Sequence, residues 1–210
     1  MTPDPTQLWI HHCGAAENIL GPGRRLVIWT SGCPLGCKGC IEEARWPLES
    51  GYAYAPADFY ASIEPLLGNI DGVTFSGGEP LYQAKAMAAL MDRLPSDLDK
   101  MLFTGYSLHE LSRTQWEVGK QMDLVVVGRF IEVLHGNHLW RGSSNQQLIS
   151  PSGKYPTEQL DAWMQEPSAG LQIHTESGVM HFYGIPVPGA LDHFFNTMQE
   201  QSITIEEAIK

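Results

Sequence analysis

Positive charge and long hydrophobic runs are both scarce in this chain, and each scarcity excludes a class of protein. The 210 residues carry 13 lysine and arginine side chains against 24 aspartate and glutamate side chains, for a formal net charge of −11. Proteins that bind nucleic acid through its phosphates usually present a basic face, so we expect no nucleic acid partner. No apolar run approaches the ~20 residues that span a bilayer, so we expect no membrane partner either.

The first residues lack the pattern of a secretory signal. The stretch MTPDPTQLWIHHCG has no basic region followed by a hydrophobic segment, and we therefore expect a cytoplasmic protein. Hydrophobic residues make up 43% of the chain and charged residues 18%. That balance is typical of a folded globular protein rather than of a disordered chain.

Cysteine is also scarce, but three of the four cysteines are crowded together. Cys33, Cys37 and Cys40 form a C-x3-C-x2-C pattern in the stretch TSGCPLGCKGC, whereas Cys13 stands alone upstream. Thiols stay reduced in the cytoplasm, where such a cluster favours metal binding over disulfides. Three thiolates can hold a [4Fe–4S] cluster and leave one iron without a protein ligand. With Cys13, four thiolates can instead close a structural zinc site; the residues favour the cluster, because structural zinc sites usually use two separated pairs.

Short apolar runs alternate with segments of helical period, which predicts an α/β fold. Strands buried on both faces and separated by single helices form parallel sheets with right-handed crossovers. We expect strands at 25–32, 72–78, 100–106 and 123–130, and helices at 56–70, 81–94 and 107–122.

Two local signals refine the expected helices. Pro65 interrupts the first helical pattern, in which Phe59, Ile63, Leu66 and Leu67 share a face, and it predicts a kink or an early stop. Ser107 and Glu110 form a capping box, in which each side chain accepts from a free amide at the start of a helix.

The pattern changes after about residue 150. A turn-rich connection leads to a short helix at about 160–165, and residues 171–188 alternate about a Glu-Ser-Gly turn as in a β-hairpin. A last amphipathic helix then carries Leu191, Phe194, Phe195 and Met198. We predict that residues 151–210 form an extension packed on the core.

The second expected strand ends in SGGEP, residues 76–80. Gly77 and Gly78 leave the backbone bare, so that a ligand can approach it closely, and Glu79 can pair with an ammonium group. An ordinary strand-to-helix turn accounts for this motif equally well when it is taken alone. It gains weight because the cysteine loop also follows a strand, and α/β proteins build their sites at that edge of the sheet.

The cysteine pattern followed by GGEP resembles the radical S-adenosylmethionine (SAM) superfamily. More narrowly, six segments in order resemble the small proteins that activate anaerobic ribonucleotide reductase, a glycyl radical enzyme. These segments are NILGPGRR, SGCPLGCKGC, FSGGEPLY, FTGYSLHEL, DLVVVGRFIEVL and LWRGSSNQ. The resemblance implies that residues 1–150 are a radical SAM core, a partial (β/α) barrel with a mainly parallel sheet. It does not extend to residues 151–210.

The resemblance also implies a set of cofactor contacts. Three irons of a [4Fe–4S] cluster would be bound by Cys33, Cys37 and Cys40, and the fourth iron would chelate the amino and carboxylate groups of SAM. The amino group would also meet the GGE motif, and the ribose or carboxylate would meet side chains that follow the third and fourth strands. The proposed SAM contacts are Gly77, Gly78, Glu79, Thr104, Arg129, Ser143 and Asn145. A polar turn is an equally good account of Ser143 and Asn145.

The activity implied by the resemblance is reductive cleavage of SAM to methionine and a 5′-deoxyadenosyl radical. In an activase this radical takes a Cα hydrogen from a glycine of a partner, a glycyl radical enzyme, and a flavodoxin- or ferredoxin-type protein donates the electron. Two alternatives stay open: a radical SAM enzyme that modifies a small molecule or peptide, and a zinc-stabilised binding module. Ile41 and Glu42 stand where related sequences commonly have an aromatic residue or histidine and then asparagine, a departure that concerns the partner more than the chemistry.

Overall fold

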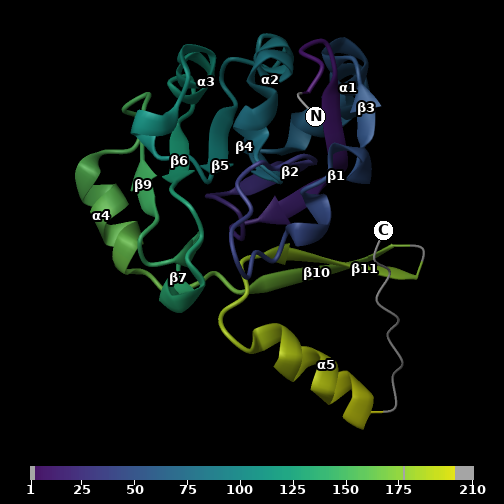
Figure 1. Cartoon of the computed structure of the whole chain (residues 1–210), viewed down its shortest axis with the longest axis vertical. Helices are drawn as coiled ribbons and strands as arrows, with labels where there is room; N and C mark the ends of the chain where they lie inside the picture. Colours follow the sequence, from purple (N-terminus) through teal and green to yellow (C-terminus); the bar gives the residue numbers. More distant parts are fainter. Residues whose placement is uncertain (1–2, 177, 202–210) are drawn as a thin grey trace.

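The computed structural model describes residues 3–176 and 178–201, and it is built around one seven-stranded sheet (Figure 1). The strand order is β3-β1-β2-β4-β5-β6-β9. The strands are β1 (Leu8–Glu17), β2 (Arg24–Thr30), β3 (Tyr52–Tyr54), β4 (Gly72–Gly77), β5 (Asp99–Thr104), β6 (Leu124–Val127) and β9 (Gln147–Ile149).

The centre of the sheet is parallel and its edges are antiparallel. Strands β2, β4, β5 and β6 pair in parallel, in the order in which they occur along the chain. Strands β1 and β3 extend the sheet on one side and β9 on the other, each through an antiparallel pairing. The predicted α/β class with a mainly parallel core is confirmed, and the carboxyl ends of the four central strands meet at one edge.

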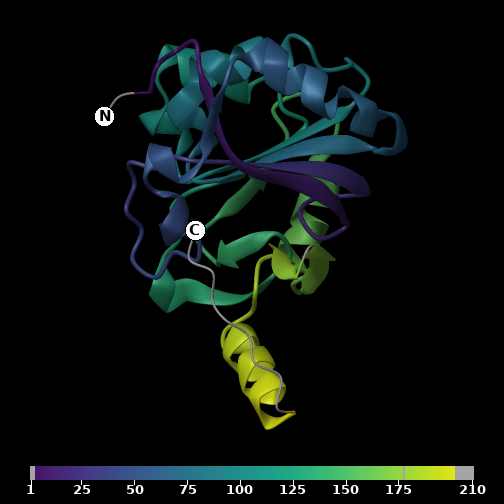
Figure 2. The same ribbon diagram turned by 90° about the vertical axis from the view of Figure 1, so that its right-hand side faces the viewer.

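Helices cover one face of this sheet (Figures 1 and 2). Their buried side chains include Phe59, Met87 and Leu90, which join the apolar face of the central strands in the largest core cluster. The three helices are α1 (Pro56–Ile63), α2 (Ala84–Met91) and α3 (Arg113–Gly119).

Two helices differ from expectation for local reasons. The α-helical part of the first ends at Ile63, and a 3-10 segment containing Pro65 follows it, so that Leu66 is half exposed instead of lying on the buried face. The Ser107–Glu110 capping box closes a single 3-10 turn, and a second capping box at Ser112 begins α3.

Strand β1 was not predicted. Its sequence, LWIHHCGAAE, lacks a clean alternation of apolar and polar residues, yet it pairs with β2 over most of its length. Tertiary pairing decides such a segment, because strand propensity depends on the neighbouring strand.

The predicted hairpin and last helix are both present; Ser177 of the predicted turn and residues 202–210 of the predicted extension lie outside the described residues. Besides β9, the strands and α-helices after β6 are β7 (His135–His138), β8 (Arg141–Ser143), α4 (Thr157–Gln165), β10 (Leu171–Glu176), β11 (Val179–Gly184) and α5 (Ala190–Glu200). The β10–β11 ribbon crosses beyond the sheet on the side away from α1–α3, and α5 projects past it (Figures 1 and 2).

Aromatic contacts help to join the extension to the core. Trp163 of α4 meets Trp140 with ring centroids 5.0 Å apart, and the buried Tyr183 of β11 lies 4.7 Å from Trp29 of β2. The boundary at residue 150 stays a prediction: the main sheet ends at Ile149, but α4 packs back onto that sheet. In the part of the chain that the structure describes, no helix has the length and apolar character needed to cross a membrane.

A buried ion pair fixes the amino ends of the central strands. Arg25 of β2 is 1% exposed and pairs with Asp99 of β5 at 2.8 Å. Its guanidinium also donates to Thr74 Oγ1 at 2.6 Å and to the Val73 carbonyl at 2.8 Å, both in β4. Tyr155, in the segment after β9, donates to the same Asp99 carboxylate at 2.7 Å.

We expect Arg25→Met to lower the free energy of unfolding by about 3–5 kcal/mol, because it removes the buried cation of Asp99 and leaves only Lys154, whose side chain is 45% exposed, 2.7 Å from that carboxylate. Urea unfolding followed by circular dichroism measures this loss. Arg93→Met removes an exposed arginine and serves as the control. An unfolding free energy within about 1 kcal/mol of the wild type, the range of exposed ion pairs, would contradict the expectation.

Candidate functional site

The three-cysteine loop begins where β2 ends, at the carboxyl edge of the parallel strands. Its two ends are held together by backbone hydrogen bonds: the Gly32 amide donates to the Arg45 carbonyl at 2.8 Å, and the Cys33 amide to the Trp46 carbonyl at 2.9 Å. Gly32 has φ +88°, which only glycine adopts without strain. All three cysteines in the loop are half-buried free thiols.

The GGE motif lies directly against the start of this loop. The Gly78 amide donates to the Thr30 carbonyl at 2.8 Å, and the Glu79 amide to the Gly32 carbonyl at 2.9 Å. A Cβ atom at Gly78 would lie 2.5 Å from the Gly32 carbonyl oxygen, and one at Gly77 would lie 2.4 Å from that of Thr30. Both glycines are therefore required by the close approach of two backbones.

Glu79 joins the ends of β4 and β5. Its side chain is 1% exposed and accepts hydrogen bonds from Thr104 Oγ1 at 2.9 Å and from the amides of Gly105 at 2.8 Å and Leu81 at 3.0 Å. Burial raises the pKa of Glu79 to about 7, although these three donors act in the opposite direction. Thr104 and Glu79, two of the predicted SAM contacts, are therefore hydrogen-bonded to each other in this structure.

Arg129 reaches the cysteine loop from the end of β6. Its guanidinium pairs with Glu110 at 2.9 Å and lies 3.5 Å from the Leu35 carbonyl, inside the loop. Hydrogen bonds from Ser107 and from Arg129 lower the pKa of Glu110 to about 2. The Arg129 side chain is 44% exposed, and its carboxylate partner already lies at the edge of the site.

Ser143 and Asn145 support the segment that carries Arg129. Ser143 is fully buried and its Oγ accepts from the Ile131 amide at 3.1 Å, while the Asn145 side chain donates to the Arg129 carbonyl at 2.9 Å. These bonds fit the polar-turn interpretation, and contact of either residue with SAM stays a prediction. The other predicted residues gather around the cysteine loop itself.

Cys13 lies apart from the three clustered cysteines. It sits within β1 opposite Ile28 of β2 and packs against the main core, where burial raises the pKa of its thiol. Among the residues that the structure describes, no group of three or more histidine, cysteine, aspartate and glutamate side chains is placed to hold one metal ion. Zinc would need its four sulfurs at about 2.3 Å from one centre, which this arrangement does not provide.

A [4Fe–4S] cluster fits the same residues better. Each cysteine binds a different iron of the cluster, so the three thiols need not converge on one point. Burial raises the pKa of Cys33 to about 11, so in the metal-free chain this thiol keeps its proton until a metal displaces it. The backbone of Gly77 and Gly78 lies directly against the start of this loop.

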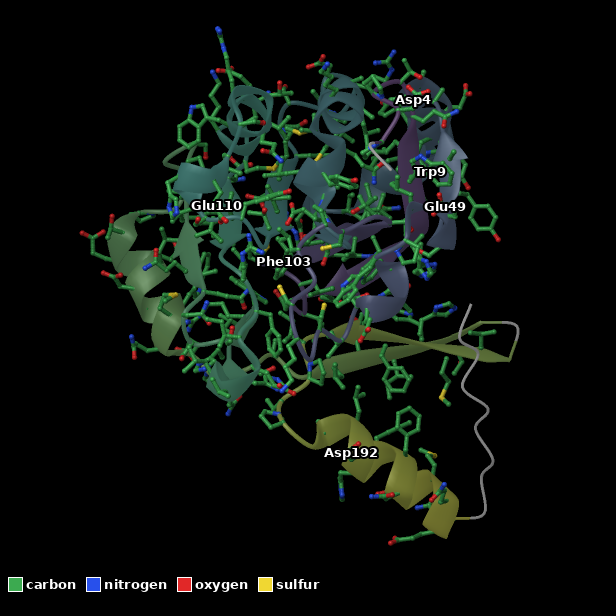
Figure 3. All side chains as sticks on the ribbon, in the orientation of Figure 1. Asp4, Trp9, Glu49, Phe103, Glu110 and Asp192 are labelled. Carbon is green, nitrogen blue, oxygen red and sulfur yellow. The ribbon has the colours of Figure 1, made fainter. Side chains whose placement is uncertain are left out.

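Two cavities adjoin the loop on the side of the C-terminal hairpin. The smaller one, of about 140 Å³, is lined by Cys40, Ile41, Ser76 and Phe103 together with residues of the hairpin, and Figure 3 shows Phe103 between the sheet and that hairpin. The larger one, of about 610 Å³, continues along the hairpin and is lined by residues 179–184 of β11. Both are lined by Ile41, Glu42, Trp29, Phe182, Gly184 and Pro186.

Sequence reasoning missed the aromatic and imidazole cluster at the larger cavity. His12 Nε2 lies 2.7 Å from the Tyr183 hydroxyl, and the His12 ring stacks on that of His181 with centroids 4.6 Å apart. Burial and the neighbouring His181 lower the pKa of His12 to about 4, so this ring is neutral at neutral pH. No local signal joins residues so far apart in the sequence.

Comparison with known proteins assigns the family of this chain from a match over more than half of its length. Residues 19–149 match the model of the 4Fe-4S single cluster domain. An anaerobic ribonucleoside-triphosphate reductase-activating protein of Vibrio cholerae is 36% identical over 147 residues, which are 66% of this chain and 95% of that protein. Proteins of the same name from Escherichia coli K12 and phage T4 are 32% and 31% identical, over 65% and 63% of this chain and 94% and 87% of their own.

A solved structure is also similar in outline. Crystallographic QueE from Escherichia coli aligns over 94% of this chain and 92% of its own, with 14% identity and a TM-score of 0.44.

We expect Gly78→Ala to weaken iron binding by about tenfold or more, the usual cost of displacing groups that support metal ligands. The added Cβ would collide with the Gly32 carbonyl and shift the start of the loop. Iron per chain after anaerobic reconstitution, at limiting iron, measures the effect. Gly68→Ala, where a Cβ meets nothing within 4 Å, is the matched control, and equal iron content in both variants would contradict this account.

The raised pKa of Glu79 predicts a pH dependence of stability. Because its pKa of about 7 lies above the ordinary 4.5, the folded state holds the proton more tightly than the unfolded state. The contribution of Glu79 to the free energy of unfolding is fully present below about pH 4.5 and is lost as the pH rises through 7. In the metal-free chain, the wild type should lose up to about 3 kcal/mol of unfolding free energy relative to Glu79→Gln over this interval, at about 1.4 kcal/mol per pKa unit.

Denaturant titrations at several pH values measure this difference. The exposed carboxyl variant Glu49→Gln serves as the control. A constant difference between the wild type and Glu79→Gln across the interval would show that Glu79 keeps an ordinary pKa.

Proposed function

We propose, from the premise that this chain belongs to the 4Fe-4S single cluster domain family and is a radical SAM enzyme, that it activates a glycyl radical enzyme. The partner would be an anaerobic ribonucleoside-triphosphate reductase or a related enzyme. The observation that carries the proposal is the position of the three-cysteine loop against the GGE backbone, within a region that is 36% identical to an activating protein over 95% of that protein's length.

Cys33, Cys37 and Cys40 would hold the cluster, and the carbonyls and carboxylate of the GGE motif would receive the amino group of SAM. When bound, the cluster would supply the electron that reduces the sulfonium of SAM, with cleavage of its C–S bond to methionine and a 5′-deoxyadenosyl radical. The residues of this chain position the reactants and keep water away. Trp29, Phe103 and Phe182 provide an apolar lining beside Cys40 for that purpose.

Arg129 is suited to the carboxylate of SAM. A guanidinium can bind a carboxylate through two parallel hydrogen bonds, and this one already holds Glu110 at the edge of the cysteine loop. Exchange of Glu110 for the SAM carboxylate would keep the charge of Arg129 paired. A flavodoxin- or ferredoxin-type protein would supply the electron.

One observation favours a second candidate, a radical SAM enzyme that modifies a small molecule or peptide. The extension contributes Phe182, Gly184, Ile185 and Pro186 to the cavity next to Cys40, so it shapes the space into which a substrate would enter. The genome separates the two functions: a gene for a glycyl radical enzyme beside this one supports the activase, and the absence of any such gene from the genome would overturn it.

We expect anaerobically prepared protein to bind about four irons and to form 5′-deoxyadenosine from SAM when dithionite is added. Cys40→Ala should lose both properties, and Cys13→Ala should keep both, because Cys13 lies in the core away from the loop. Iron analysis and chromatography measure the two. Colourless wild-type protein with one bound zinc would contradict the cluster.

The proposal that this chain activates a glycyl radical enzyme is tested by electron paramagnetic resonance. Wild-type protein mixed with SAM, reductant and an anaerobic ribonucleoside-triphosphate reductase should give the doublet signal of a glycyl radical, and Cys40→Ala should not. Formation of 5′-deoxyadenosine without any glycyl radical would favour the second candidate.

A further inference from the structure

The larger cavity runs along the edge of strand β11. Side chains of a strand alternate between its two faces, so a cavity over one face touches every second residue. This cavity is lined by six consecutive residues: Val179, Met180, His181, Phe182, Tyr183 and Gly184. Strand β10, on the other side of the ribbon, contributes only Leu171. The cavity therefore lies beside the backbone of β11 and not above its side chains.

The contacts of neighbouring residues agree with this placement. Tyr183 points to the main sheet, where it meets His12 and Trp29. Phe182 points the opposite way, to Phe194 of α5, with ring centroids 5.2 Å apart. Both faces of the ribbon are thus engaged by the rest of the chain, and the open space is at the edge between them.

That edge carries hydrogen-bonding groups suited to another strand. Within residues 3–176 and 178–201, β11 pairs with β10 and with no other strand. In an antiparallel pair, alternate residues direct their N–H and C=O groups away from the partner strand. Such an edge is a template onto which an extended peptide adds as a further strand.

The opposite wall of the groove leads to the cysteine loop. Ile41, Glu42 and Arg45 form this wall, and Glu42 and Arg45 pair with each other. Ile41 and Glu42 also line the smaller cavity, together with Cys40. The smaller cavity has a volume of about 140 Å³, which is that of about five water molecules at 30 Å³ each. It therefore has room for peptide backbone and small side chains.

We propose that the free edge of β11 binds an extended, uncharged segment of another polypeptide as a third strand and so presents a glycine to the small cavity beside Cys40. The identity of that polypeptide as a glycyl radical enzyme rests on the proposed function, but the binding mode does not. An uncharged segment fits because the charged wall is paired internally, and a glycine fits because the end of the groove is small. Ile41 and Glu42, the two positions at which this chain differs from related sequences after the third cysteine, also line this groove.

The test uses the cluster-loaded protein without reductant and a fluorescein-labelled heptapeptide of alternating threonine and valine with a central glycine. Two further peptides carry N-methyl groups on alternate backbone amides, one in each of the two possible phases. A peptide strand directs only alternate N–H groups to the edge it joins. Fluorescence anisotropy should therefore show saturable binding that is weakened by about tenfold or more in one phase and unchanged in the other.

Matched variants locate the groove. Ile41→Arg places a charged side chain into it and should weaken binding of the unmethylated peptide by about tenfold. Val133→Arg is the control: Val133 is 88% exposed, it follows Glu132, which pairs with Lys38 of the cysteine loop, and it lines neither cavity. This variant should leave the affinity unchanged. Equal iron content in both variants shows that the loop is intact.

Each other outcome counts against the proposal. Absence of saturable binding at about 1 mM peptide, equal effects of the two methylation phases, or equal affinities of the two variants would overturn it. The glycyl radical measurement is independent of these readouts. Phase-specific binding without a glycyl radical would defeat the activase function and keep the groove, whereas a glycyl radical without phase-specific binding would defeat the groove alone.

Discussion

The contact between two bare stretches of backbone sets the geometry of the whole site. Residues 77–79 lie against residues 30–32 so closely that a single methyl group at Gly77 or Gly78 would collide with a carbonyl oxygen. This approach ties the end of β4 to the start of the cysteine loop. Glu79 then extends the connection to β5 through Thr104 and Gly105. The loop that carries the cysteines is thus held by backbone hydrogen bonds from a neighbouring strand, and its own sequence is free to turn tightly around a cofactor.

The C-terminal extension shapes the space beside the cysteine loop through which a substrate would reach the site. Residues 19–149, which include the parallel strands and the cysteine loop, match the 4Fe-4S single cluster domain, and the β10–β11 ribbon lies outside that match, beside the cavities that adjoin the loop. Tyr183 anchors the ribbon on β1 and β2, and Phe182 joins it to α5. The ribbon leaves a groove rather than a closed lid, and the groove ends beside Cys40. Under the proposed function, the core would accept a partner's chain and the extension would guide that chain to the same site.

Local sequence patterns predicted the central strands, the hairpin and the family, because each depends on residues close together in the chain. The β-branched runs, the glycine turns and the C-x3-C-x2-C spacing are signals of this kind. The predictions were weaker where long-range packing decides. Strand β1 has an irregular pattern and forms because β2 pairs with it. Leu66 is half exposed because the helix changes to a 3-10 turn at Pro65. Ser143 and Asn145 support the Arg129 segment in this structure, and no pattern in WRGSSNQ distinguishes that role from contact with a cofactor.

The sequence by itself therefore determined the groups expected to carry the chemistry: three thiols in one loop and a bare glycine backbone after the next strand. It left Cys13 as a possible fourth zinc ligand, and the structure placed that residue in β1 against the main core. Only the tertiary structure decided the surroundings of that chemistry. Ile41 and β11 lie on opposite walls of one groove although more than a hundred residues separate them. Hydrophobic burial has no direction of its own, so sequence pattern shows which residues are buried but not which distant segments meet. Strand pairing and the packing of Tyr183 and Phe182 supply that choice, and they place an open strand edge next to the cysteine loop.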